Sequence, residues 1–279
     1  MIVQPPAEAG EPSFVILQND HTAFAGELAR HFGNERFARL EPAELVDALV
    51  SWHDEGWTEI DDRFLPDPTT GLPYNLISTP LPELIGTTAR SAAKGEARHP
   101  FIGLLASKHA CGLYNGRDGL VDLVILDLLP PEVRSQVDPI LAAEGERQER
   151  LRAELRADPG TAALAEDAAI HRTFNALQLF DMFALYVQCE HPSRHAEATF
   201  PGVPVDDDAG HDVTITATPM GRGRYVLDPY PFDVDPFEPA TAGRYLEAQP
   251  PGTDLAAVWA AAGPSEQRIS LGSHAGAWG

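Results

Sequence analysis

Apolar residues recur at the spacing of one helix face through the first two thirds of the chain. Clusters of Pro, Gly and Asp separate these stretches and are typical of loops. The longest such cluster covers residues 61–73, between the second and third predicted helices. The pattern therefore predicts a series of helices, which cover residues 21–32, 42–54, 81–95, 101–114, 131–160 and 161–190.

The last quarter of the chain changes period. Val213, Ile215 and Ala217 alternate with threonines, which is the two-residue period of a β-strand. A Gly-Arg-Gly turn follows, so residues 224–228 are expected to return as a partner strand. A last strand is expected over residues 267–271, which indicates a small sheet in this region.

Together these patterns predict a mainly helical protein that is α+β overall. We expect one helical domain over residues 14–195 and a small antiparallel β-rich extension over residues 196–279 that packs on it. A chain of 279 residues is long enough for one large domain with such an extension. Residues 14–17 fit either a short strand or the lead into the first helix.

Four titratable residues fall on the apolar side of predicted helices. His53 follows Val50 by three residues, so it lies on the apolar stripe of its helix, and Asp54 stands beside it. His21 and Asp181 occupy similar positions on two other predicted helices. A buried charge needs a partner, which is either a metal ion or an ordinary arginine or backbone group. Ligands from separate helices that converge in a core are a common way to build a metal site.

Other candidates surround these four. His109 is expected to face the interior from the helix over residues 101–114, and Lys108 beside it either meets a substrate anion or stays on the surface. Glu55, Asp61 and Asp62 follow the His-Asp pair in a polar stretch. Each of these carboxylates is a candidate general base, and a solvated acidic loop is the other interpretation.

The chain is strongly acidic, with a formal net charge of −22 at pH 7. Such a charge repels phosphate backbones and anionic lipid surfaces, so neither nucleic acid polymers nor membranes are expected as partners. A small anionic substrate is compatible with this charge if a metal ion supplies local positive charge. The sequence does not decide the oligomeric state.

The two cysteines, Cys111 and Cys189, show no metal-ligand spacing and no disulfide framework, so both are expected to be free thiols. The N-terminus lacks a basic region followed by an apolar core. No apolar run approaches the roughly 20 residues of a membrane span. We therefore expect a cytoplasmic protein.

The order of the candidate ligands resembles that of the HD-domain superfamily of metal-dependent phosphohydrolases. Residues 20–25 (DHTAFA) resemble the first helix of that family, and residues 48–56 (ALVSWHDEG) its apolar run that ends in HD-x-G. Residues 177–181 (LQLFD) resemble its final aspartate helix, so the resemblance covers roughly residues 14–190. The whole chain, with its HDEGW and PYPF segments, looks like a bacterial branch described as a domain of unknown function.

This resemblance implies an HD-type helical bundle in which His21, His53, Asp54 and Asp181 bind a metal. His109 stands where dinuclear members place extra histidines, and the lack of further clear ones favours a single ion. Nitrogen and oxygen ligands suit Mn, Fe, Co or Zn. The implied activity is hydrolysis of a small phosphorylated molecule or nucleotide, because a bound divalent ion acidifies water and polarises a phosphoryl oxygen.

The sequence departs from the family at one position, because Trp57 stands where many members have a lysine after HD-x-G. Two alternatives therefore stay open. One is a di-iron oxygenase of the HD type, which needs a fuller set of histidines. The other is a metal-containing binding or structural protein without turnover, which the missing lysine favours. No P-loop, dinucleotide fingerprint or nucleophile elbow occurs in the chain.

Overall fold

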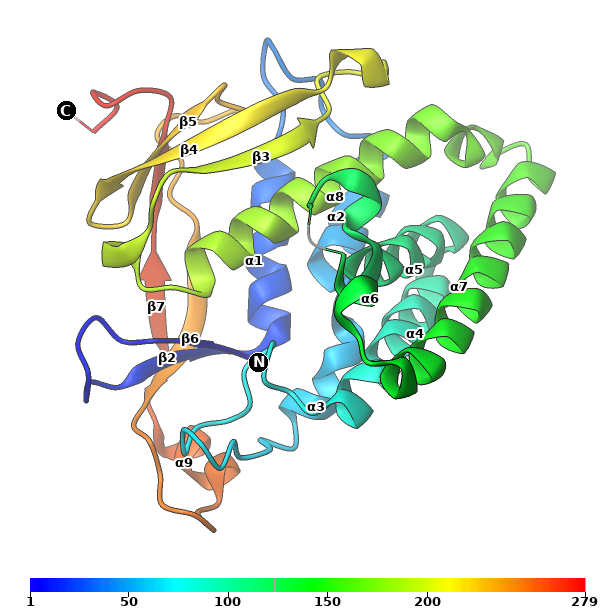
Figure 1. The fold of residues 1–279 in the computed structure, drawn as a ribbon. Helices are drawn as coiled ribbons and strands as arrows, with labels where there is room; N and C mark the ends of the chain where they lie inside the picture. Colours follow the sequence, from blue (N-terminus) through cyan, green and yellow to red (C-terminus); the bar gives the residue numbers. More distant parts are fainter. Residues whose placement is uncertain (123, 279) are drawn as a thin grey trace.

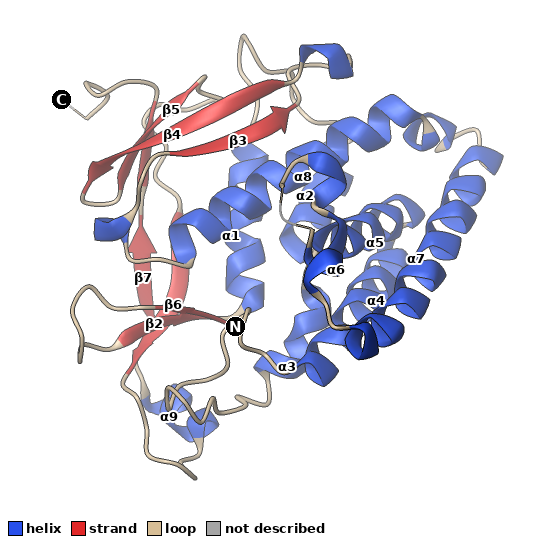
Figure 2. Ribbon diagram, viewed as in Figure 1, coloured by secondary structure: helices blue, strands red, loops and turns tan. Residues whose placement is uncertain are grey.

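The computed structural model describes residues 1–122 and 124–278. The strands gather on one side of the molecule and α4, α5 and α7 on the other, with α1 and α8 between them (Figure 1; Figure 2). This arrangement confirms the predicted α+β class. The helices in chain order are α1 (Gln18–His31), α2 (Ala43–Trp52), α3 (Thr58–Asp61), α4 (Leu81–Arg98), α5 (Pro100–Asn115), α6 (Ile125–Leu128), α7 (Pro131–Ala157), α8 (Asp167–Gln188) and α9 (Leu255–Ala261).

In the part of the chain that the structure describes, the strands form two small four-stranded sheets. The first has the order β1-β2-β6-β7 and the second the order β3-β4-β5-β8. The strands are β1 (Ile2–Gln4), β2 (Ser13–Ile16), β3 (Ala198–Val203), β4 (Val213–Gly221), β5 (Arg224–Asp228), β6 (Ala240–Leu246), β7 (Ser265–Arg268) and β8 (Ser270–Gly272).

The first sheet joins the two ends of the chain. Strand β2 pairs with β6, and Phe14 lies opposite Tyr245. The sheet therefore crosses the predicted boundary at residue 195, and residues 14–17 are mostly strand. The second sheet is antiparallel except for one pair, because β5 and β8 run parallel. The predicted strand over residues 267–271 is interrupted at Ile269 and divides between the two sheets.

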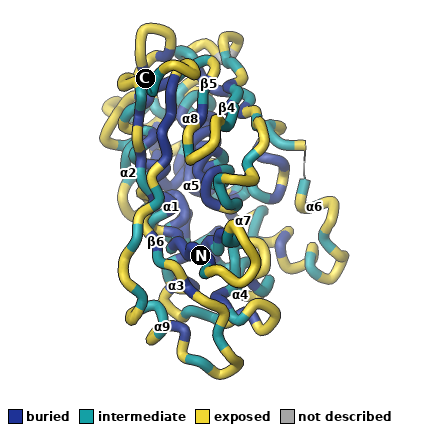
Figure 3. Tube along the Cα trace, turned by 90° about the vertical axis from the view of Figure 1, so that its left-hand side faces the viewer, coloured by how far each residue is buried: buried dark blue, intermediate teal, exposed yellow. Residues whose placement is uncertain are grey.

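One buried apolar cluster extends from the helices into the second sheet. Helix α1 packs against α2 and α8, and α5 packs against α4, α7 and α8. Buried residues follow α1, α5 and α8, whereas α6 lies on the periphery (Figure 3). On the sheet side, Phe183 of α8 packs against Phe200 with ring centroids 5.5 Å apart. Helix α8 therefore contacts both the helical part and the second sheet.

The ends of α5 follow from its sequence. Pro100 occupies the first turn, and the His99 side chain accepts a hydrogen bond from Phe101 N at 3.1 Å. Gly116 ends the helix in the left-handed conformation, with φ 75°. This turn sends the chain back so that Arg117 is buried beside α8.

Two boundaries differ from the predicted ones near the His-Asp pair. Helix α2 ends at Trp52, so His53 caps the helix and Asp54 lies just beyond it. Asp61 belongs to α3 and Asp62 caps it, although both were expected in a loop. A one-turn 3-10 helix, η1 (Glu55–Trp57), links α2 to α3 and causes this difference. Within the described residues, no helix combines the length and apolar character needed to cross a membrane.

Gly56 allows η1 to lie directly on the backbone of α4. Gly56 N donates to Ser91 Oγ at 3.0 Å, and its carbonyl accepts from Arg90 Nε at 3.0 Å. A Cβ at this position would lie 2.4 Å from Thr87 O and 2.6 Å from Ser91 N. The glycine after the His-Asp pair is therefore required by packing.

We predict that Gly56→Ala lowers the free energy of unfolding by about 2 kcal/mol, because α4 must move away. Urea denaturation measures the change. Gly145→Ala is the matched control, since nothing lies within 4 Å of its added Cβ and alanine favours the helix. Equal stability of Gly56→Ala and the wild type would contradict the close packing of η1 on α4.

Candidate metal centre

His21 lies in the first turn of α1 and is fully buried. Its Nδ1 donates to Gln188 Oε1 at 2.7 Å, and Gln188 Nε2 donates to Thr241 Oγ1 of β6 at 3.0 Å. With Gln188 Oε1 as the acceptor, the proton of the neutral ring sits on Nδ1, which leaves a lone pair on Nε2. That Nε2 lies 3.0 Å from Asp181 Oδ1.

His53 presents the same tautomer from the end of α2. Its Nδ1 donates to Val50 O at 2.8 Å, which is one of the carbonyls left free where the helix ends. Its Nε2 has no hydrogen-bond partner among the described residues and lies 3.5 Å from Asp181 Oδ1. The carbonyl thus orients the ring in the way that second-shell partners orient metal-binding histidines.

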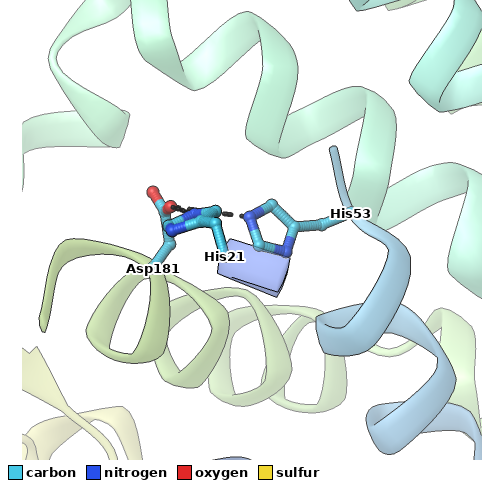
Figure 4. Close-up of side chains that lie close together, drawn as sticks. All are labelled: His21, His53 and Asp181. Atoms are coloured by element: carbon cyan, nitrogen blue, oxygen red, sulfur yellow. Dashed lines mark hydrogen bonds and ion pairs between the residues drawn. The ribbon is translucent and has the colours of Figure 1, made fainter. Parts of the chain in front are cut away.

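The two rings and the carboxylate converge from three elements (Figure 4). The ligand atoms of His21, His53 and Asp181 all lie within 4.8 Å of one another, and all three residues are buried. Two imidazole lone pairs that face one carboxylate oxygen repel it unless a proton or a cation lies between them. The residues present therefore fit a divalent metal ion.

Asp54 and His109 form a second group with His53, whose ligand atoms also lie within 4.8 Å of one another. Asp54 Oδ2 is 3.9 Å from His53 Nε2, and Asp54 Oδ1 is 3.9 Å from His109 Nε2. Gln18 Nε2 lies 3.4 Å from Asp54 Oδ2. The structure therefore brings together all five predicted metal ligands.

The hydrogen bonds of His109 differ from those of the other two histidines. Gln178 Oε1 accepts from Arg117 Nη1 at 2.5 Å, and a guanidinium can only donate. The amide group of Gln178 must therefore face His109, and its Nε2 donates to His109 Nδ1 at 3.1 Å. The proton of neutral His109 consequently sits on Nε2. This favours a hydrogen-bond donor over a ligand, and the predicted ligand role of His109 stays a prediction.

The electrostatics of the centre depend on Asp181. Burial alone would raise the pKa of Asp181, but the Arg117 guanidinium, with hydrogen bonds from the rings of His21 and His53 when these carry a proton on Nε2, holds the pKa well below its ordinary value. Arg117 Nη1 lies 2.7 Å from Asp181 Oδ2, although this ion pair is not aligned as a hydrogen bond. Asp181 is therefore an anion with remaining acceptor capacity.

The pKa values of the neighbouring groups shift in different directions. Burial raises the pKa of the Asp54 carboxyl, against the opposing effect of His53. Burial acts to lower the pKa of His53, but the charges of Asp54 and Asp181 outweigh it and raise the pKa. Burial holds the pKa of His109 well below its ordinary value, so this ring is neutral.

The predicted bases and the predicted anion-binding lysine lie elsewhere. Glu55 pairs with Arg98, and Asp61 accepts hydrogen bonds from the Met1 ammonium and Gln18 N, each at 2.6 Å. Lys108 pairs with Asp118 and lies over the Phe174 ring, 4.3 Å from its centroid. Asp62 is at the exposed end of α3. The geometry does not support catalytic roles for these four residues, which stay predictions.

Four buried polar residues of the centre were missed from the sequence. Arg117 and Gln178 fix His109 and compensate Asp181, while Gln188 and Gln18 contact His21 and Asp54. The sequence spacing could have indicated two of them. Gln178 stands three residues before Asp181 and Gln188 seven residues after it, on the same face of α8. Arg117 gave no such signal, since it follows a glycine turn.

The fold and the centre define an α+β protein with a buried histidine–aspartate cluster able to hold a metal ion. Residues 1–248 match the family described as Protein of unknown function (DUF3891), and the chain belongs to that family. No curated protein and no solved structure matches the chain.

We predict that Arg117→Met lowers the free energy of unfolding of the metal-free protein by about 3 kcal/mol, because the buried Asp181 carboxylate loses its partner. Added Mn²⁺ or Zn²⁺ should recover part of this loss, since a bound cation compensates the same charge. Thermal and urea unfolding with and without chelator measure both effects.

Arg30→Met is the control for this variant. The side chains of Arg30 and its partner Asp47 are each nearly half exposed, so the pair contributes less than about 1 kcal/mol and should not respond to metal. The same loss in both variants, unaffected by metal, would contradict the view that Arg117 and a cation compensate one charge.

Proposed function

We propose that this protein is a metal-dependent phosphohydrolase with a single divalent ion held by His21, His53 and Asp181, with Asp54 beside them. One observation carries the proposal: each of the two imidazoles has its Nδ1 proton committed to a protein acceptor and directs its Nε2 toward one carboxylate oxygen. Nitrogen and oxygen ligands favour Mn, Fe, Co or Zn over Ca or Mg.

The resemblance to the HD-domain superfamily supports the same proposal. The ligands come from α1, the end of α2 and α8, in the chain order of that superfamily. Trp57, at the position of the usual lysine, is buried and lines the cavity that adjoins the centre. The position that carries a lysine in many members of that superfamily is therefore an apolar wall in this chain.

When bound, the metal would supply Lewis acidity for a phosphoryl oxygen and lower the pKa of water beside it. The chain's own residues would do the rest. His109 Nε2 would donate a hydrogen bond to a phosphoryl or leaving-group oxygen in the cavity, because its Nδ1 is held by Gln178. Arg117 would hold Asp181 in its charged form and in place.

The oxygenase alternative requires a second metal in the group formed by His53, Asp54 and His109. The hydrogen bond from Gln178 to His109 opposes this, because a ligating Nε2 would need the proton on Nδ1. A binding protein without turnover would use the same first metal site.

The proposal also includes the predicted small anionic substrate and the predicted cytoplasmic location.

We predict about one equivalent of Mn, Fe, Co or Zn in the purified protein, and its loss in His53→Gln, because His53 belongs to both groups of ligands. Elemental analysis measures the metal, and release of phosphate from phosphate monoesters measures activity. Asp54→Asn should weaken metal binding, which tests the fourth ligand. His274→Gln is the matched control, since this exposed histidine lies outside both groups.

Two other results of the elemental analysis would contradict the proposal. Two irons per chain would replace the phosphohydrolase with the oxygenase. No metal in the wild type, even after reconstitution, would assign the cluster a structural role and remove the proposal.

A further inference from the structure

A cavity of about 560 Å³ adjoins the metal centre, which is the ordinary size for a small-molecule site. Asp54, His109, Arg117 and Asp181 line it and form its polar end. The remainder is enclosed by η1, α4, the end of α5 and the segment that contains α6. The centre thus opens into a space whose walls determine which molecules reach it.

Away from the centre, the walls of the cavity are mostly apolar. The apolar side chains there include Trp57, Ile77, Leu81, Leu84, Leu113 and Ile125. Thr87, which also lines the cavity, donates its hydroxyl to Leu84 O within its own helix at 2.7 Å. Such walls offer contact to hydrocarbon and few hydrogen bonds to a sugar or a base.

The charges at the polar end admit one anionic group. Among the described residues that line the cavity, Arg117 is the single lysine or arginine, and it is engaged by Asp181 and Gln178. The charges of Asp54, Asp181, Arg117 and a bound divalent ion would sum to one positive charge. A nucleoside polyphosphate carries several negative charges and would find no further cation on these walls.

The mouth of the cavity leaves large apolar side chains in water. Ile77 is 90 % exposed and Ile125 is 36 % exposed, and α6 buries none of its residues. Both isoleucines line the cavity. Apolar surface grouped at the mouth of an apolar cavity is typical of a binding site, because a ligand chain would remove it from water.

We infer that the substrate is a phosphate monoester of an aliphatic alcohol, whose headgroup lies at the metal centre and whose hydrocarbon chain fills the cavity. This inference rests on the proposed function and names its substrate class. The reaction is balanced by water alone: the oxygen of water bonds to phosphorus, the ester P–O bond breaks, and a proton passes to the alkoxide oxygen. The products are the free alcohol and inorganic phosphate.

The first test measures binding without turnover. Butyl-, hexyl-, octyl- and decylphosphonate carry a P–C bond that hydrolysis cannot cleave, and calorimetry below their micelle concentrations gives their dissociation constants on metal-loaded and metal-free protein. Affinity should rise by about fourfold for each added methylene until the chain outgrows the cavity. Fluorescence of the buried Trp57 should respond to the chain.

Two variants test the cavity walls with little risk to folding. Ile125→Gln and Ile77→Gln should each weaken octylphosphonate by roughly tenfold and leave butylphosphonate nearly unchanged. Leu128→Gln is the matched control, because Leu128 stands on the same short helix, is 69 % exposed and does not line the cavity. Equal losses at Ile125 and Leu128 would overturn the assignment of the cavity.

The results separate this inference from the proposed function. Affinity independent of chain length, with hydrolysis of short esters intact, would overturn the inference and leave the phosphohydrolase. Length-dependent binding without hydrolysis of octyl phosphate by the metal-loaded protein would overturn the phosphohydrolase and leave the apolar cavity as a ligand site. Octanol that binds as tightly as octylphosphonate would show that the headgroup is not recognised, and would overturn the substrate class.

Discussion

The negative charge of Asp181, buried in the middle of α8, is the constraint to which the rest of the centre responds. A carboxylate in this position is costly unless charged or hydrogen-bonding partners surround it. The partners come from distant segments: His21 from α1, His53 from the end of α2, and Arg117 from the turn after α5. Helices α1, α2, α5 and α8 thus meet at one charge, and their packing decides whether that charge is stable.

The β part of the molecule contributes to the same centre. Thr241 of β6 accepts the hydrogen bond of Gln188, which in turn accepts the Nδ1 proton of His21. Strand β6 pairs with β2, and β2 leads directly into α1. The first sheet therefore fixes both the position of α1 and the tautomer of the histidine that it carries. The C-terminal segment is part of the support of the centre, even though its sequence carries none of the candidate ligands.

The cavity beside the centre has mostly apolar walls, which bear on the kind of molecule that fits there. The position after HD-x-G holds Trp57, which adds apolar surface beside the ligands where a lysine would add charge. Two of the three predicted bases, Glu55 and Asp61, pair with Arg98 and with the Met1 ammonium, and Lys108 pairs with Asp118. The charged and imidazole groups that line the cavity are Asp54, Asp181, His109 and Arg117, and Thr87, Thr88 and Tyr114 are its other polar lining residues. The inferred substrate, with one charged headgroup and an apolar remainder, follows from this arrangement.

The sequence by itself determined the long helices, the strand pair over residues 213–228 and the four residues around which the centre forms. These follow from short-range rules: apolar periodicity defines a helix face, and a histidine or aspartate on that face must be buried with a partner. The tertiary structure decided what the partners are. Arg117 and Gln178 meet 61 residues apart in the chain, and β2 meets β6 across more than 200 residues. No local pattern records such contacts, because they depend on how complete elements pack. For the same reason, the tautomers of the histidines and the apolar walls of the cavity could be read only from the folded chain.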